Sequence, residues 1–197
     1  MKNLENDNRG CCSGGTGCCS SAEPIQSNKR NVVIDFLYLD LSTCTWCQGT
    51  EQSLENALED VSKVLNASEI EVILNKINVN SEELAIKHKF ISSPTIRVNG
   101  HDIQMKVKEK KCESCGDLCG DNVDCRVWEF NGEEYTVPPK ALIIEGILKC
   151  VFGGVSINTE NDEYKLPENL KKFYIAMKEK SINESCCGGD NANKCCG

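Results

Sequence analysis

The sequence predicts an α/β fold in which strands and helices follow one another in the order βαβαββα. The first observation is a run of apolar, largely β-branched side chains over residues 31–41, which is typical of a buried central strand. The second is a set of apolar side chains at helical spacing, which predicts an amphipathic helix over residues 47–65. The third is another apolar run at residues 70–79, which predicts a second strand and completes a βαβ unit.

The next elements are indicated by capping and turn residues. A short helix is expected to begin at Asn80 or Ser81, because both residue types cap helices well. Two further strands are predicted at residues 95–98 and 101–107. They flank Asn99-Gly100, and Asn-Gly between two such runs is a strong hairpin signal.

Residues 108–137 form a predicted insertion, whose first half is rich in cysteine and whose second half repeats the hairpin pattern. Strands at 126–130 and 133–137 are expected to flank an Asn-Gly turn. An apolar helix over residues 140–152 should then pack on the sheet, and a last helix is predicted from about 167 to 180. We therefore expect one folded domain over residues 31–180.

Both ends of the chain are predicted to be flexible cysteine-rich tails, residues 1–30 and 181–197. Each is rich in glycine and polar residues and has too little apolar surface to offset the entropy of ordering. The first ten residues have no apolar segment of a secretory signal, and no apolar run approaches the roughly 18 residues of a membrane span. We therefore expect a cytoplasmic protein.

The charge of the chain excludes some partners. The formal net charge is -8, from 30 acidic and 22 basic residues among 197. Binding to nucleic acid or to an anionic membrane surface needs a basic face, so neither partner is expected. The chain also has 15 cysteines. In a cytosolic protein, that content indicates metal binding or redox chemistry more than a disulfide framework.

Cys44 and Cys47 form the central pair of the sequence, in the order Cys44-Thr-Trp-Cys47 between the first strand and its helix. Unpaired N–H groups and the partial positive charge of a helix N-terminus stabilise a thiolate there. Cys44, which we expect to be the more exposed of the two, would be the attacking thiolate. Cys47, one turn later, would resolve a mixed disulfide or complete a chelate.

The strand, the cysteine pair, the helix and Ser93-Pro94-Thr95 together resemble the thioredoxin superfamily over about residues 31–107. The resemblance implies a thioredoxin-like core with Pro94 as a cis-proline beside the Cys-x-x-Cys motif, and thus a catalytic role for Cys44, Cys47 and Pro94. Unlike thioredoxins, the chain has no proline between the two cysteines.

A closer resemblance is to a poorly characterised bacterial thioredoxin-like family sometimes labelled alkylmercury-lyase-like. It rests on three motifs, which are Thr43-Cys44, Cys112-x-x-Cys115 and Asp124-Cys125-Arg126. The label implies cleavage of a carbon–metal bond, which needs two thiolates and an acid. Asp40 and Glu51 flank the central pair and are the nearest acids.

Four insertion cysteines lie within 14 residues and offer a metal site. They are Cys112, Cys115, Cys119 and Cys125. Four thiolates suit zinc, and a closed zinc site would stabilise a loop that has little core of its own. Alternatively, some of these thiols face the central pair and extend one soft-metal or redox site. Both interpretations remain open at this stage.

Adjacent cysteines recur in both tails. The pairs are Cys11-Cys12, Cys18-Cys19, Cys186-Cys187 and Cys195-Cys196. Two neighbouring thiols form a strained disulfide but bind thiophilic ions well. In outline, the arrangement resembles the arsenic metallochaperones, which carry such pairs on a thioredoxin-like fold.

The leading hypothesis is therefore a protein that binds or transfers soft metal or metalloid ions such as arsenic, mercury, copper or zinc, in heavy-metal or metalloid detoxification. A thiol–disulfide oxidoreductase that uses Cys44 and Cys47 is the first alternative, and an organomercurial lyase-like enzyme is the second. A protein whose cysteines are mainly structural zinc ligands is the third. The expected cofactor is zinc or another thiophilic metal, and no organic cofactor is indicated. The expected protein partner is a redox partner or a metal-efflux protein.

Overall fold

A parallel βαβ unit forms the centre of the fold in the computed structural model, which describes residues 30–119, 123–154 and 163–186. Strands β1 (Arg30–Tyr38) and β2 (Ile70–Asn78) are parallel and in register over their whole length, and helix α1 (Thr45–Ala67) connects them. The predicted α/β fold class is confirmed. Within the part of the chain that is described, no helix has the length and apolar character needed to cross a membrane.

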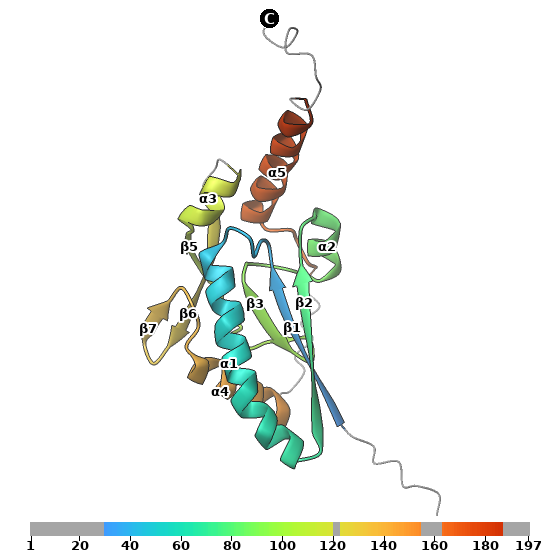
Figure 1. Ribbon diagram of the computed structural model, residues 1–197, viewed down its shortest axis with the longest axis vertical. Helices are drawn as coiled ribbons and strands as arrows, with labels where there is room; N and C mark the ends of the chain where they lie inside the picture. The colour runs from blue at the N-terminus through green and yellow to red at the C-terminus, as the bar shows by residue number, and fades with distance from the viewer. Residues whose placement is uncertain (1–29, 120–122, 155–162, 187–197) are drawn as a thin grey trace, which may run out of the picture.

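The main sheet has the mixed strand order β2-β1-β3-β4 (Figure 1). Helix α2 (Glu82–Lys87) leads to β3 (Thr95–Val98), which pairs antiparallel with β1. Strand β4 (His101–Asp102) completes the sheet by pairing antiparallel with β3. This is the βαβαββ order predicted from the sequence, with the Asn-Gly turn between β3 and β4.

Helix α4 (Lys140–Phe152) closes the core and matches its predicted bounds. It packs against α1 and β3. Gly146 also lets the helix lie close to Ile103, which follows β4, because a Cβ at Gly146 would lie 2.7 Å from the Cβ of Ile103. The main core is built by apolar side chains of β1, α1, β3 and α4, among them Ile34, Phe36, Leu54, Val61, Leu65, Ile96, Ile143 and Ile147.

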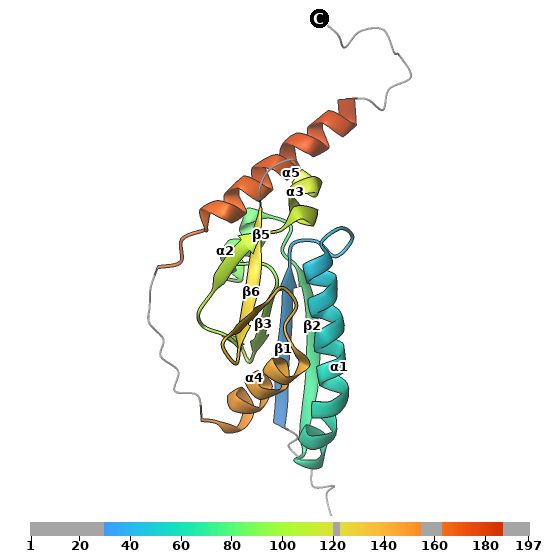
Figure 2. The same ribbon diagram turned by 90° about the vertical axis from the view of Figure 1, so that its left-hand side faces the viewer.

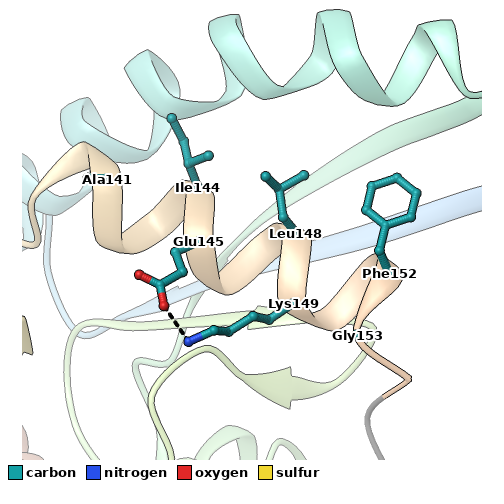
Figure 3. Close-up of a pocket in the computed structure, with 7 residues that line it drawn as sticks. All are labelled: Ala141, Ile144, Glu145, Leu148, Lys149, Phe152 and Gly153. Carbon is teal, nitrogen blue, oxygen red and sulfur yellow. Dashed lines mark ion pairs between the residues drawn. The ribbon is translucent and has the colours of Figure 1, made fainter.

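Only one side of α4 is buried in this core, although the helix is apolar on nearly every side. An open groove of about 650 Å³ lies along the helix and is lined by Ile144 and Leu148, which are partly buried at the edge of the core, and by the exposed Phe152. The three side chains project from the same side of the helix, beside an ion pair between Glu145 and Lys149 (Figure 3). The predicted packing of α4 on the sheet therefore accounts for only part of its apolar surface.

The insertion forms a second, antiparallel sheet beside the first one (Figure 2). It consists of β5 (Lys108–Lys111), β6 (Asp124–Phe130) and β7 (Glu133–Tyr135), and helix α3 (Glu113–Cys119) lies between β5 and β6 in the chain. The predicted second hairpin is confirmed as β6 and β7. The sequence pattern did not predict β5 or α3, because β5 is four charged residues and α3 is short.

Several predicted boundaries are wrong. Strand β1 ends at Tyr38, whereas it was expected to reach residue 41, and β7 ends at Tyr135, whereas it was expected to reach residue 137. The strand expected over residues 101–107 ends at Asp102, because the Asp102 carboxylate accepts a hydrogen bond from the Gln104 N–H at 2.8 Å and the backbone turns away. The last helix, α5 (Glu168–Cys186), continues beyond residue 180. Residues 181–186 are therefore helical, whereas they were predicted to belong to a flexible tail.

Helix α5 closes the end of the molecule at which α1 begins and α3 lies (Figures 1 and 2). Its residues Leu170, Phe173 and Tyr174 are buried in a second apolar cluster. The Tyr174 hydroxyl donates a hydrogen bond to the Val79 carbonyl at 2.9 Å. The Asn169 side chain bonds both the N–H and the C=O of Asp124 on β6. Helix α5 thus connects the main sheet to the insertion.

A buried arginine anchors the insertion to the main sheet. Arg126 on β6 has no exposed surface and forms two hydrogen bonds with the Asp102 carboxylate, at 2.7 and 2.8 Å. It also donates to the Thr95 hydroxyl and lies over the Trp128 ring. The Arg126 N–H donates to the Ser93 carbonyl at 2.7 Å. Burying a guanidinium is costly unless a carboxylate compensates its charge. The Arg126–Asp102 pair therefore helps to hold the insertion on the main sheet.

We predict that Asp102→Asn lowers the free energy of unfolding by about 2–4 kcal/mol, because it leaves the buried guanidinium of Arg126 without a counter-charge. The measurement is chemical denaturation of the reduced protein at a fixed zinc concentration. Asp60→Asn is the control, since it removes an exposed ion pair with Lys140. Equal effects of the two substitutions would contradict the anchoring role.

Candidate metal centre

Cys44 lies at the N-terminus of α1 because the chain turns sharply after β1. The Asp40 carboxylate accepts the Thr43 N–H at 2.6 Å and so closes the turn. Cys44 itself has extended backbone angles and is the N-cap residue, with its Sγ accepting the Cys47 N–H at 3.3 Å. An N-cap side chain takes the place of the missing helical partner of that N–H group. The sequence correctly placed this cysteine between strand and helix.

Three insertion cysteines lie opposite Cys44. Cys112 follows β5, Cys115 is in the first turn of α3, and Cys125 is on β6. The N–H of Cys112 donates to the Val123 carbonyl, which connects the start and the end of the α3 segment. The pairing of β5 with β6 then brings three cysteines from a 14-residue segment to one place.

The four thiols form one compact group. The sulfur atoms of Cys44, Cys112, Cys115 and Cys125 all lie within 4.8 Å of one another. The Cys44–Cys112 distance is 4.0 Å and the Cys115–Cys125 distance is 3.4 Å. Zinc–thiolate bonds of about 2.3 Å in a tetrahedron put the sulfur atoms about 3.8 Å apart. The group therefore fits a tetrahedral thiophilic ion.

The group is closed to solvent. Cys44, Cys115 and Cys125 have no exposed surface, and Cys112 is 2% exposed. The expectation that Cys44 is the more exposed cysteine of the central pair is wrong, because Cys44 and Cys47 are both fully buried. The insertion covers Cys44. The sequence around Cys44 does not predict this burial, because the covering segment lies far away along the chain.

Cys47 lies beside the group but does not belong to it. Its Sγ is 3.4 Å from the Ser93 hydroxyl, which also accepts the Leu39 N–H. The Ser93–Pro94 peptide bond is cis, as the resemblance implied. Ser93 was not singled out in the sequence, although its position directly before Pro94 and near the cysteine pair is a usable signal.

A second residue that sequence reasoning missed is Ser114, between Cys112 and Cys115. Its hydroxyl is 3.4 Å from the Cys112 Sγ and accepts the Thr45 N–H at 3.3 Å. Ser114 therefore links the insertion directly to the first residue of α1. Its signal in the sequence is its place inside the Cys-x-x-Cys motif.

The side chains of the other cysteines predicted as metal ligands lie outside the described residues. Cys119 ends α3 and Cys186 ends α5, but their side chains lie outside the described residues. The same holds for the remaining tail cysteines, Cys11, Cys12, Cys18, Cys19, Cys187, Cys195 and Cys196. Cys150 is half-buried on α4, and burial raises its pKa. Among the six cysteines whose side chains are described, none forms a disulfide.

The close approach of the thiols lowers the pKa of some of them and raises the pKa of others. Hydrogen bonds from Cys112, Cys115 and Cys125 hold the pKa of Cys44 well below its usual value. Hydrogen bonds with Cys115 and Cys125 lower the pKa of Cys112 to about 6. The contact with Cys112 raises the pKa of Cys115 and Cys125 far above the usual value. A group of this kind keeps protons on some sulfurs until a cation compensates the charge.

Cys47 has a raised pKa, first because of its contact with Cys44 and then because of burial. The hydrogen bond with the Ser93 hydroxyl, and then one from the backbone of Asp40, lower this pKa in turn. Without an ion, the central pair therefore combines a thiolate at Cys44 with a thiol at Cys47.

Residues 32–147 match a family described as a domain of unknown function (DUF2703). The matched segment runs from β1 into α4 and contains Cys47 and all four cysteines of the thiol group. The predicted tails lie outside it. No curated protein and no solved structure matches the chain.

We predict that zinc binding releases protons and weakens as the pH falls. The raised pKa of Cys115 and Cys125 keeps both thiols protonated at neutral pH, and a metal ion must displace those protons. Each proton released lowers the apparent affinity about tenfold for a decrease of one pH unit. Competition with a chromophoric chelator between pH 6 and 8 measures this slope, and a flat profile would contradict the prediction.

Proposed function

The chain belongs to the DUF2703 family, and we propose that it binds a thiophilic metal ion through the thiolates of Cys44, Cys112, Cys115 and Cys125. The observation that carries the proposal is the mutual approach of four buried sulfur atoms to within 4.8 Å. Four thiols in such a cavity repel one another once they ionise, and a divalent cation compensates that charge.

The donor set favours a soft ion in tetrahedral coordination. Thiolates select zinc and copper(I) over hard cations such as magnesium and calcium. Zinc is the first candidate, because four sulfur ligands at these separations match its usual structural sites. Four protein ligands leave no position for water, so the ion would be held as a structural ion or as cargo and would not activate a substrate.

The position of the group suggests what the ion does for the fold. One ligand comes from the core domain and three come from the insertion, so an ion would cross-link the two. The described part of the insertion also contributes buried apolar residues, which include Val123, Val127 and Trp128. A metal cross-link would add to the anchoring by Arg126, and binding free energy would become folding free energy.

Transfer of soft metal or metalloid ions is the finer proposal. The adjacent cysteine pairs of the two tails are suitable for capturing arsenic, mercury or copper ions and passing them on by ligand exchange. Cys47 supports this possibility, because it is a further thiol in contact with the ligand Cys44. A thioredoxin-like scaffold that carries metal-binding tails would serve detoxification, with a metal-efflux protein as the acceptor.

Thiol–disulfide exchange is the second candidate, favoured by one observation. Cys44 and Cys47 occupy the first turn of α1, and their side chains interact. Two features weigh against a protein substrate. Cys44 has no exposed surface, and the Ser93 carbonyl beside the pair already accepts the Arg126 N–H.

The lyase-like alternative needs an acid near the thiolates. The Asp40 carboxylate instead accepts the N–H of Thr43, and Glu51 forms an ion pair with Lys76 at 2.8 Å. Both carboxylates are therefore engaged in structural contacts. No carboxylate belongs to the thiol group among the described residues.

We predict that cobalt(II) binds at this site with the visible absorption and sulfur-to-metal charge transfer of a tetrahedral thiolate complex. Cys125→Ser and Cys44→Ser should each reduce the affinity for cobalt(II) and zinc at least about tenfold, since each removes one of four ligands. The measurement is an anaerobic titration of the reduced full-length chain with competition by a chelator.

Cys150→Ser is the matched control, because it also removes one thiol but lies outside the group. It should leave the tetrahedral spectrum and the affinity of the tightest site unchanged. If Cys125→Ser and Cys150→Ser behave alike, the tightest site is elsewhere in the chain and the proposal fails.

We further predict that oxidation of the central pair releases the ion. Hydrogen peroxide, an oxidant small enough for a buried site, accepts two electrons and two protons and is reduced to two molecules of water, while Cys44 and Cys47 join in a new disulfide. Residues three apart on a helix face the same side, which makes this bond feasible. Cys44 can then no longer act as a metal ligand.

The readout is zinc release to a chromophoric indicator during titration with hydrogen peroxide, with mass spectrometry to locate the disulfide. Cys47→Ser should retain its zinc at oxidant concentrations that empty the unmodified protein. Equal release from both proteins would mean that other thiols account for the effect.

A further inference from the structure

A second cavity, of about 440 Å³, lies between the end of α2 and the β3–β4 hairpin. Its lining residues include Lys87, His88, Lys89, Arg97, His101 and Asp102. None of them belongs to the thiol group. The chain has two histidines in total, and both of them line this cavity.

The cavity is locally positive in a chain of net charge -8. Lys87, Lys89 and Arg97 line it, whereas Asp102 is the one acidic residue of the lining. The Asp102 carboxylate is already compensated by the buried Arg126. Asp35 also faces Arg97 across the β1–β3 register. When the buried Arg126 is counted with the three lining cations, four positive charges stand against the carboxylates of Asp102 and Asp35, so the local field favours an anion.

Arg97 forms a fixed wall of the cavity. Its guanidinium donates to the carbonyls of His88 and Lys89 at 2.5 and 2.9 Å. These two carbonyls follow the end of α2, where the partial negative charge of a helix would otherwise repel an anion. Arg97 thus compensates that charge and holds residues 87–89 in place beside β3.

Besides Gly100, the remaining lining residues are apolar. Ile91 is 50% exposed, Met105 is 82% exposed, and Val107 is half-buried. A cavity of this volume is within the range of about 300–1,000 Å³ typical of small-molecule sites, and it is larger than one inorganic anion needs. The combination of cationic and apolar walls suits a ligand with an anionic group on an apolar body.

We propose that this cavity binds small organic anions, in which a phosphate or carboxylate group is attached to an apolar or aromatic body. The anionic group would lie against Lys87, Lys89 and Arg97, and the body would cover Ile91 and Met105. The site is independent of the thiol group, so its test does not depend on metal binding.

The two histidines are built-in reporters for this test. Their ring signals are followed by NMR in the zinc-supplemented, reduced full-length chain during titrations at constant ionic strength. The probes are phenyl phosphate, benzoate and the neutral analogue benzamide. We expect saturable shifts of both histidine signals with the two anions, at dissociation constants of about 1–10 mM for ligands of this size. The stronger of the two anions identifies the preferred head group.

Substitutions that reverse the charge of lining lysines test whether the anion binds in this cavity. The double substitution Lys87→Glu with Lys89→Glu should weaken binding of phenyl phosphate about tenfold, because two favourable contacts become repulsive. Lys63→Glu with Lys172→Glu is the matched control, since it changes the net charge equally at exposed positions on α1 and α5. The control should bind phenyl phosphate like the unmodified chain.

Three outcomes would overturn the proposal. The first is that neither anion shifts both histidine signals up to about 30 mM, several times the expected dissociation constant. The second is that benzamide shifts them as strongly as benzoate. The third is that the control double variant loses as much affinity as the cavity variant, which would indicate a general effect of charge.

Discussion

The arrangement depends on one electrostatic constraint, that four buried thiols cannot all ionise at close range without a cation. The sulfur atoms of Cys44, Cys112, Cys115 and Cys125 lie within 4.8 Å of one another and are shielded from water. In that setting, mutual repulsion keeps protons on some of them, and a soft divalent ion removes the conflict. Because Cys44 belongs to the core and the other three to the insertion, the same ion would determine how firmly the two parts are joined.

The insertion is also joined to the core without metal, through strand β6. Successive side chains on a strand point to opposite faces. Cys125 therefore reaches the thiol group, while its neighbour Arg126 reaches the Asp102 carboxylate on the other side. The two anchors are adjacent in the chain but differ in chemistry, one needing an ion and the other a buried ion pair. The Asp-Cys-Arg motif thus has a physical explanation. Its cysteine and its arginine contact the core from opposite faces of β6.

Most of the core could be predicted from the sequence, because its elements are long and carry clear periodicity. The bounds of α4 and the position of the second hairpin were predicted well, and the cis-proline at Pro94 was implied by resemblance. The sequence could not show which cysteines form the thiol group, because Cys44 and Cys112 are 68 positions apart and only the docking of the insertion brings them together. The burial of Cys44 was missed for the same reason. Arg126 gave no local signal of burial, since its partner Asp102 lies in another hairpin.

The two leading functional hypotheses, metal binding and thiol–disulfide exchange, both depend on Cys44, and they are therefore not independent. As a thiolate at the N-terminus of α1, it is suited both to bind a metal ion and to react with Cys47. A sulfur atom that forms a disulfide is no longer available as a thiolate ligand. Metal binding and oxidation of the central pair thus exclude each other at this position. The fully buried Cys47 lies outside the four-thiol group, yet it contacts Cys44, and through that contact a bound ion and the redox state of the central pair would affect each other.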